Sequence, residues 1–360
     1  MQVSWVCYVG AMAVYTSLDD AQLRTLLAIY PGCGDVQAVE GVAAGSINSI
    51  FRVTTSTGVF YVRVSEGQTL LELGKERDLL SHLHRHVHAT SGVRAPHMRR
   101  NAARGTFFTV ADHQWACVFD ELQGRELGVF ELTPDHLAQL GRYLAQVHHV
   151  LRRARLRRKN PYGVPRMLQW MERIGRDLPA PLPIDVDRVL QPVLRARRRR
   201  LLPRGVIHGD LFINNTKWQK NQLSAVFDWE MAGTDHLLLD VAIVLCAWCW
   251  VRPQGETEGS FRDDLVRALL DAYQQVRPFS AQEKRSFANE LRLATLRFTV
   301  SRIHDFELPR EGDVERVHLP YEDFWARTQW VLGKWDADLA TRWLGESGAR
   351  RASASGMLQP

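Results

Sequence analysis

Apolar residues follow two different spacings along the chain, and the spacing changes near residue 124. From residue 39 to residue 119 apolar and polar positions mostly alternate, as they do in half-buried strands. A helix is predicted at 69–86, where leucines recur three and four positions apart. The predicted strands are 48–55 and 59–65, which form a hairpin, 106–111 and 115–119. The spacing therefore indicates a small antiparallel sheet that carries one helix.

Helical spacing dominates after residue 124. Two short strands interrupt it: one ends at Val206 and Ile207, and the other is predicted at 223–229, after a hairpin turn. The predicted helices are 134–151, 185–200, 236–250, 261–275, 281–305 and 321–344. We expect an α+β protein with an antiparallel β-rich lobe at 12–120, a larger helical lobe at 121–346 and a disordered tail at 347–360.

The composition is that of a globular protein: 45% of the 360 residues are hydrophobic and 24% are charged. The longest apolar run, about residues 237–251, contains Asp240 and is too short to cross a bilayer. Residues 1–11 lack the cationic start and apolar core of a signal peptide, and we interpret them as an upstream extension. The expected location is the cytoplasm, without membrane contacts.

The five cysteines are scattered through a long chain, which does not favour a disulfide framework. Cys246 and Cys249 have a spacing found in redox and zinc sites, but their apolar helical surroundings predict a buried pair. The net charge of +6 comes mostly from arginines, which are concentrated at 151–159 and 195–204. Because no aromatic residues alternate with them, these clusters favour solvated helix ends over a nucleic-acid site.

Two stretches, 206–215 and 225–230, contain the residue types that phosphoryl transfer requires. That reaction needs a carboxylate facing the acceptor hydroxyl, and hard oxygen ligands that hold Mg²⁺ against the phosphates of ATP. The candidates are Asp210 and His208 as catalytic residues, and Asn215 and Asp228 as metal ligands. Either stretch alone could match by chance, so the prediction depends on both occurring in this order around a hairpin.

A glycine-rich stretch at 41–49 comes directly before the first strand of the other hairpin. Small residues allow backbone N–H groups to approach phosphate oxygens there, although they are also ordinary turn residues. The candidates for nucleotide binding in this stretch are Gly41, Gly45, Ser46 and Asn48.

The strand that follows should present a cation to the phosphates, and the residue at that position is Arg63. A guanidinium keeps its charge and can hold phosphate through two N–H groups; an exposed strand arginine is the alternative. Glu76 is the candidate to pair with Arg63, and Glu72 is the second choice. Glu121 lies in the segment between the lobes, whose backbone groups would contact the adenine of ATP.

These motifs resemble the aminoglycoside phosphotransferase and choline kinase group, a small-molecule branch of the protein-kinase-like fold. Within that group the sequence is most similar to the homoserine kinase family. The resemblance rests on residues 41–49, 208–212, 240–249, 272–278 and 296–312. The last stretch is the most particular to homoserine kinases.

The resemblance implies a bilobal protein-kinase-like fold that transfers the γ-phosphoryl group of ATP to the hydroxyl of L-homoserine, with Mg²⁺ as the metal. It implies that Asp210 is the base, that Asn215 and Asp228 bind the metal, and that Asp240 supports the catalytic loop. Arg63 departs from the usual kinase lysine, and the neighbours of Asp228 also differ from the familiar pattern. Neither departure removes a needed group.

An acceptor with a carboxylate and an ammonium group calls for one cationic and one acidic partner in its pocket. The candidates share one predicted helix and are Arg297, Arg302, His304 and Asp305. A buried structural network is the alternative for these residues. Other acceptors, such as aminoglycosides or choline, and a non-catalytic kinase-like binding protein also stay open, as does the oligomeric state.

Overall fold

The computed structural model describes residues 18–42, 48–66, 68–111, 114–154, 156, 158–178, 183–198, 201–253, 258–308 and 318–345. The chain divides into two compact units. The first contains mainly the described residues 18–85 and 94–122, and the second contains 86–93, 123–308 and 319–345.

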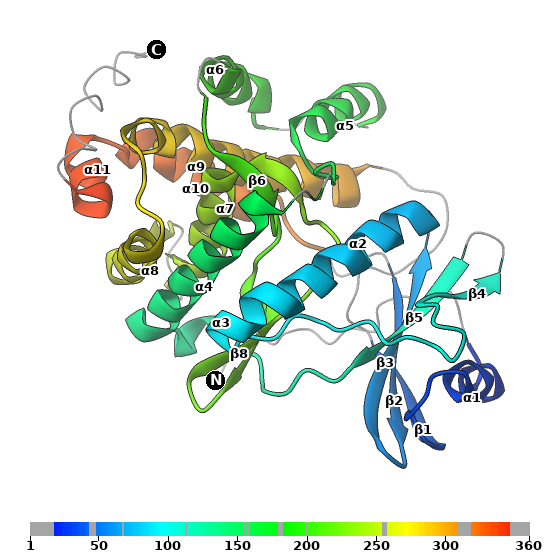
Figure 1. Ribbon diagram of the computed structural model, residues 1–360. Helices are drawn as coiled ribbons and strands as arrows, with labels where there is room; N and C mark the ends of the chain where they lie inside the picture. Colours follow the sequence, from blue (N-terminus) through cyan, green and yellow to red (C-terminus); the bar gives the residue numbers. More distant parts are fainter. Residues whose placement is uncertain are drawn as a thin grey trace, which may run out of the picture. The chain divides into compact units, whose positions relative to one another are not determined.

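The first unit is built on an antiparallel sheet of five strands in the order β1-β2-β3-β5-β4 (Figure 1). The strands are β1 (Val36–Val42), β2 (Ser49–Thr55), β3 (Gly58–Glu66), β4 (Phe108–Ala111) and β5 (Gln114–Asp120). Burial alternates along β2, which gives the sheet one apolar face. Val53 on this face is fully buried and shares a core with Leu23 and Leu26 of helix α1 (Asp20–Ala28).

Helix α2 (Leu70–Leu83) and the four predicted strands are present in the first unit, whereas α1 and β1 are not predicted from the sequence. After α2 the chain continues as η1 (His84–His88) and α3 (Ala89–Ser91). Gly41 pairs with Phe51 at the end of β1, so the glycine-rich stretch begins within a strand. Gly45 and Ser46 lie outside the described residues.

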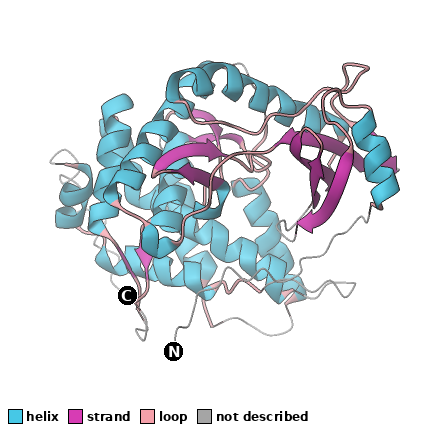
Figure 2. Ribbon diagram, turned by 90° about the horizontal axis from the view of Figure 1, so that it is seen from below, coloured by secondary structure: helices cyan, strands magenta, loops and turns pink. Residues whose placement is uncertain are grey.

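Helices make up most of the second unit (Figure 2). They are η2 (Val129–Glu131), α4 (Pro134–Arg153), α5 (Val164–Asp177), α6 (Val186–Arg198), η3 (Ile213–Asn215), α7 (Leu237–Trp248), α8 (Asp263–Val276), α9 (Ala281–Arg302), η4 (Ile303–Glu307), α10 (Glu322–Lys334) and α11 (Ala337–Leu344). Its strands form three antiparallel pairs: β6 (Arg204–Ile207) with β9 (Gly233–His236), β7 (Thr216–Gln219) with β8 (Gln222–Val226), and β10 (Trp250–Val251) with β11 (Ser260–Phe261).

Helix α7 supplies much of the core of the second unit, because it is apolar on nearly all sides and buried along nearly its whole length. Cys246 and Cys249 at its end are fully buried, as predicted, and burial raises the pKa of Cys246 to about 12. Helices α4 and α8 approach closely at Gly141, where a Cβ atom would lie 2.4 Å from the carbonyl oxygen of Leu269. A larger residue at position 141 would force these helices apart.

Two predicted elements of the second unit have the wrong bounds. The strand predicted at 223–229 ends at Val226, and the chain then turns at Asp228, which has a φ of +61°. The helix predicted at 321–344 is interrupted after Lys334. Asp336 there accepts a hydrogen bond from the N–H of Leu339 at 2.8 Å and starts α11 as its N-cap.

The two arginine clusters are only partly solvated. Arg152 and Arg153 are exposed in the last turn of α4, as predicted for cations near a helix C-terminus. The prediction is wrong for Arg158 and Arg197, whose side chains are committed to internal hydrogen bonds and ion pairs. In the described parts of the chain, no helix is long and apolar enough to cross a membrane.

Candidate active site

The buried carboxylate of Asp240 holds the loop after β6 in place. Both oxygens of Asp240 accept backbone N–H groups, from His208 at 2.8 Å and from Gly209 at 2.9 Å. Gly209 has a φ of +79° and faces the carbonyl of Met231 closely, so the turn favours glycine. Asp240 thus supports the loop, as the resemblance implied.

Asp240 is itself fixed by a second fully buried residue. The Nε2 atom of His148 lies 3.0 Å from Oδ2 of Asp240, and its Nδ1 atom lies 2.7 Å from the hydroxyl of Tyr273. Burial opposes ionisation of Asp240, but the hydrogen bond from His148 and the loop N–H groups outweigh it and lower the pKa of the carboxyl. A permanently charged Asp240 keeps the loop N–H groups satisfied.

His208 is fully buried, and both of its ring nitrogens are hydrogen-bonded within the loop region. Its Nε2 atom donates to the carbonyl of Phe227 at 3.0 Å, and its Nδ1 atom accepts the N–H of Asp210 at 3.3 Å. This pattern requires the neutral ring, because a protonated Nδ1 could not accept a hydrogen bond. Burial lowers the pKa of His208 to about 4, which favours the same state.

Asp210 and Asn215 are brought together by the turn between them. The amide nitrogen of Asn215 donates to the backbone carbonyl of Asp210 at 2.7 Å and lies 3.5 Å from its carboxylate. Among the described residues, no donor forms a hydrogen bond with the amide oxygen of Asn215. Burial raises the pKa of Asp210 to about 6, opposed by Arg297. A carboxylate of raised pKa can accept a proton from an alcohol, and an amide oxygen suits a hard cation.

Asp228 lies two residues beyond β8 in a left-handed backbone conformation, with a φ of +61°. Aspartate tolerates this region better than most residues, but it is uncommon outside turns and functional sites. Phe227 ties the turn to the loop, because its N–H donates to Asn215 and its carbonyl accepts His208. The structure thus places the residue before Asp228 against both the histidine and the asparagine of the motif.

Of the four residues predicted to bind the acceptor, Arg297 contacts the catalytic loop. Its guanidinium donates through Nη1 to the carbonyl of Gly209, and its Nε atom has no hydrogen-bond partner within the described parts of the chain. Arg302 instead donates to the carbonyl of Pro320 at 2.8 Å, just before α10. His304 lies 2.9 Å from the carboxylate of Asp305.

In the first unit, Arg63 and Glu76 form the predicted ion pair. Two nitrogens of the guanidinium donate to the two oxygens of Glu76 at 2.9 and 3.0 Å, and both side chains are buried. Glu72 instead accepts the N–H of Thr69 and caps α2. Asn48 is buried, and the side chain of Glu121 lies 3.8 Å from that of Arg52.

Glu76→Ala is expected to lower the free energy of unfolding by about 3 kcal/mol or more, because it leaves the charge of Arg63 buried and without its counter-ion. Urea denaturation of the full chain measures the loss, with Asp78→Ala on the exposed face of the same helix as the control. The double variant Arg63→Met/Glu76→Leu should regain most of the stability. Equal losses in Glu76→Ala and Asp78→Ala would contradict the expectation.

Sequence reasoning missed several residues that shape this site. His148 and Tyr273 stand behind Asp240, and Arg158 donates to the carbonyls of Trp229 and Glu230, just after Asp228. A histidine on the apolar face of an amphipathic helix, as at position 148, is a usable signal of a buried polar contact. Arg158 gives no such signal, because it stands in a run of arginines.

A supported carboxylate loop with an asparagine five residues on, in a helical unit, is typical of enzymes that transfer phosphoryl groups. The sequence matches the phosphotransferase enzyme family over residues 38–279, and the chain belongs to that family. It is similar to a homoserine kinase of Burkholderia mallei, with 32% identity over 327 residues that cover 86% of this chain and 93% of the relative. A homoserine kinase of Burkholderia multivorans is also 32% identical, over 330 residues covering 86% and 92%.

Solved structures confirm the protein-kinase-like fold. An amicoumacin kinase in complex with AMP-PNP, Ca²⁺ and its ligand has a TM-score of 0.66 at 16% identity, covering 88% of this chain and 94% of that one. A microcompartment-associated aminopropanol kinase has a TM-score of 0.60 at 17% identity, covering 92% and 99%. Choline kinase from Cryptosporidium parvum has a TM-score of 0.61 at 14% identity, covering 88% and 95%. The predicted family and the predicted fold class, a sheet-based N-terminal region and a helical C-terminal region, are both confirmed.

Proposed function

We propose that this phosphotransferase is a homoserine kinase, which transfers the γ-phosphoryl group of ATP to the hydroxyl of L-homoserine and forms O-phospho-L-homoserine for threonine biosynthesis. The observation that carries the chemistry is the hydrogen-bonded pair of Asp210 and Asn215, joined to the Asp228 turn through Phe227. The acceptor is supported by the relatives named homoserine kinase, which are 32% identical over most of this chain.

In this proposal Asp210 orients the acceptor hydroxyl and takes its proton as the phosphoryl group departs from ATP. His208 is a positioning residue, because both ring nitrogens are occupied and only its neutral form fits. Arg297 fixes Gly209 and offers its remaining N–H to the acceptor carboxylate.

The residues present fit a divalent cation. The amide oxygen of Asn215 receives no hydrogen bond within the described residues, and the turn of Asp228 is anchored to the backbone of Asn215. An amide and a carboxylate are oxygen ligands of the kind that Mg²⁺ takes together with phosphates. Bound there, Mg²⁺ would neutralise charge on the phosphates of ATP. The amicoumacin kinase complex with AMP-PNP and Ca²⁺ supports the use of a nucleotide and a divalent metal.

In the first unit, Arg63 is proposed to face the phosphates of ATP, held by Glu76 through a bidentate pair. The glycine-rich stretch 41–49, with Gly41, Gly45, Ser46 and Asn48, is proposed to bind the phosphates of ATP. The segment that contains Glu121 is proposed to contact the adenine. Arg302, His304 and Asp305 are proposed to form the floor and the acidic side of the acceptor pocket.

The acceptor is tested by coupling ADP release to a dehydrogenase assay with Mg-ATP and a panel of alcohols: L-homoserine, L-serine, choline and an aminoglycoside. The expected result is turnover that depends on L-homoserine, with kcat/KM at least about tenfold above each other acceptor. Mass spectrometry of the product should show one added phosphate. Turnover with choline or the aminoglycoside alone would replace homoserine as the acceptor, and ADP release without any acceptor would argue against a kinase of small alcohols.

A further inference from the structure

The segment between α4 and α5, residues 158–162, is fastened along β9. The N–H of Thr234 donates to the carbonyl of Arg158 at 2.8 Å, and Lys159 pairs with Thr234 in a parallel bridge. At Gly233 a Cβ atom would lie 2.3 Å from Cα of Asn160, so the two backbones touch directly. This segment therefore has a fixed position relative to the strand that leads into α7.

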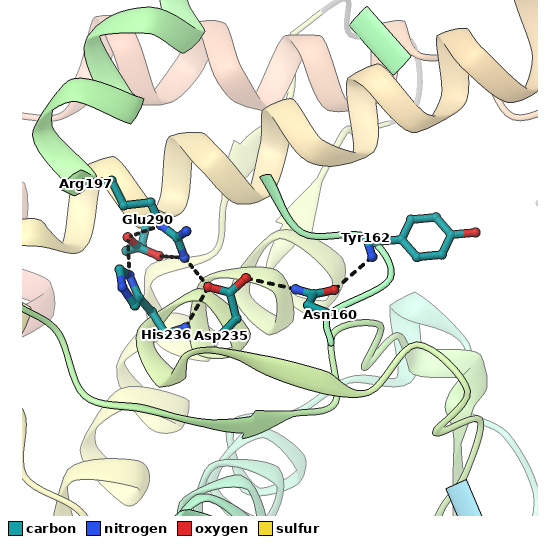
Figure 3. A network of polar contacts seen from close by, with 6 residues as sticks. All are labelled: Asn160, Tyr162, Arg197, Asp235, His236 and Glu290. Atoms are coloured by element: carbon teal, nitrogen blue, oxygen red, sulfur yellow. Dashed lines mark hydrogen bonds and ion pairs between the residues drawn. The ribbon is translucent and has the colours of Figure 1, made fainter. Parts of the chain in front are cut away.

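Asn160 joins the segment to a buried charged network (Figure 3). Its amide nitrogen donates to Asp235 at 2.9 Å, and its amide oxygen accepts the backbone N–H of Tyr162 at 2.9 Å. Asp235 also forms an ion pair with Arg197 and accepts the N–H of His236 at 2.8 Å. The side chain of Asn160 thus links the backbone of Tyr162 to Asp235.

The far side of the network is closed by Glu290 on α9. One carboxylate oxygen of Glu290 lies 3.0 Å from Nε of Arg197 and 3.1 Å from Nδ1 of His236. Burial opposes the charge of Asp235, but Arg197 outweighs it and lowers the pKa of that carboxyl. Asp235 is therefore ionised and paired with Arg197, which holds it in place for the hydrogen bond from Asn160.

The ring of Tyr162 points away from this network, as Figure 3 shows. The guanidinium of Arg297 lies 5.3 Å from the centre of the ring, and the same guanidinium donates to Gly209. Trp170 packs against the ring edge-on at 5.1 Å. Tyr162 is half-buried, and Arg297 links its ring to the backbone of Gly209, the residue before Asp210.

Two carboxylates act on the phenol of Tyr162. Burial raises the pKa of Tyr162, the charges of Asp305 and Glu230 raise it further, and the charge of Arg297 opposes them, so the phenol is neutral under all working conditions. The two carboxylate charges, unlike burial, favour a cation near the ring. A neutral aromatic ring with nearby carboxylates suits an ammonium group.

We infer that Tyr162 is a specificity-determining residue, which borders the acceptor next to Asp210 and, with Glu230 and Asp305, favours alcohols that carry an ammonium group. Asn160 is the positioning residue that sets the place of Tyr162 through Asp235. The inference rests on the proposed function for the identity of the acceptor, and it holds for any amino alcohol acceptor.

The test compares L-homoserine with 4-hydroxybutyrate, which has the same hydroxyl and carboxylate but no ammonium group. KM for L-homoserine and Ki for 4-hydroxybutyrate are measured for the wild type, Tyr162→Leu, Tyr162→Phe and Asn160→Ala, with Phe130→Leu as an exposed aromatic control. Tyr162→Leu should raise KM for L-homoserine about tenfold or more while Ki for 4-hydroxybutyrate and KM for ATP change less than about twofold, since tenfold corresponds to about 1.4 kcal/mol. Asn160→Ala should show the same selective change, smaller in size.

An equal change for both compounds, or none for either, would overturn the inference, and so would a change as large in Phe130→Leu. If Tyr162→Leu proves unstable to urea, Tyr162→Phe and Asn160→Ala decide by the same ratio. A wild type that phosphorylates choline or aminopropanol but not L-homoserine would refute the proposed acceptor; the same variants, assayed with that amino alcohol and its uncharged analogue, would still test Tyr162. A wild type that prefers uncharged alcohols would overturn the inference itself.

Discussion

Asp210→Asn is expected to lower kcat by about 10² to 10⁴-fold, the usual contribution of a positioned general base. The amide is nearly isosteric with the carboxylate, so Asn215 keeps its bond to the backbone carbonyl of residue 210 and the loop should stay intact. KM for ATP should change little, because the proposed partners of the phosphates are other residues. Steady-state ADP release with L-homoserine measures both constants.

Asp271→Asn is the matched control, because Asp271 is exposed on α8. Its kcat should equal that of the wild type. Near-normal turnover by Asp210→Asn, with a normal circular dichroism spectrum, would remove Asp210 from the role of base.

Asp228→Asn is expected to lower kcat/KM for Mg-ATP by on the order of 10³-fold or more, since charge neutralisation on the transferring phosphoryl group supplies much of the catalysis. Asparagine tolerates a φ of +61° about as well as aspartate, so this change removes the charge without straining the turn. The concentration of Mg²⁺ needed for half-maximal activity should rise strongly, and a titration of the remaining activity with Mg²⁺ measures it.

Asp228→Gly separates charge from backbone, because glycine adopts the left-handed conformation freely. It should lose activity as Asp228→Asn does while unfolding at a similar urea concentration. An unchanged dependence on Mg²⁺ in both variants would show that Asp228 is no metal ligand.

Local sequence was sufficient for the parts of the site that follow one another in the chain. The His208–Asn215 motif, the pairing of Arg63 with Glu76 and the burial of Cys246 all follow from residue type and spacing, and the structure agrees. Helix periodicity located α4, α7, α8 and α9 to within a few residues, because an apolar stripe must face a core.

The failures occur where distant contacts override a local pattern. Residues 223–229 alternate as a strand should, yet the strand stops at Val226, the carbonyl of Phe227 accepts a hydrogen bond from His208, and the chain turns at Asp228. Arg197 belongs to an arginine run that predicts a solvated helix end, yet it is paired with Asp235 and Glu290. No spacing within one segment encodes these partners.

The amino-acid sequence was enough to predict the fold class, the phosphotransferase family and candidate residues for phosphoryl transfer, because these predictions depend on residue types at short, fixed separations. Only the tertiary structure shows how the site is supported. His148, behind the catalytic loop, bonds Tyr273 at a separation of 125 positions, and Asn160, which positions Tyr162, bonds Asp235 at a separation of 75. Buried polar groups must find partners, and which partners they find depends on how the helices and strands pack.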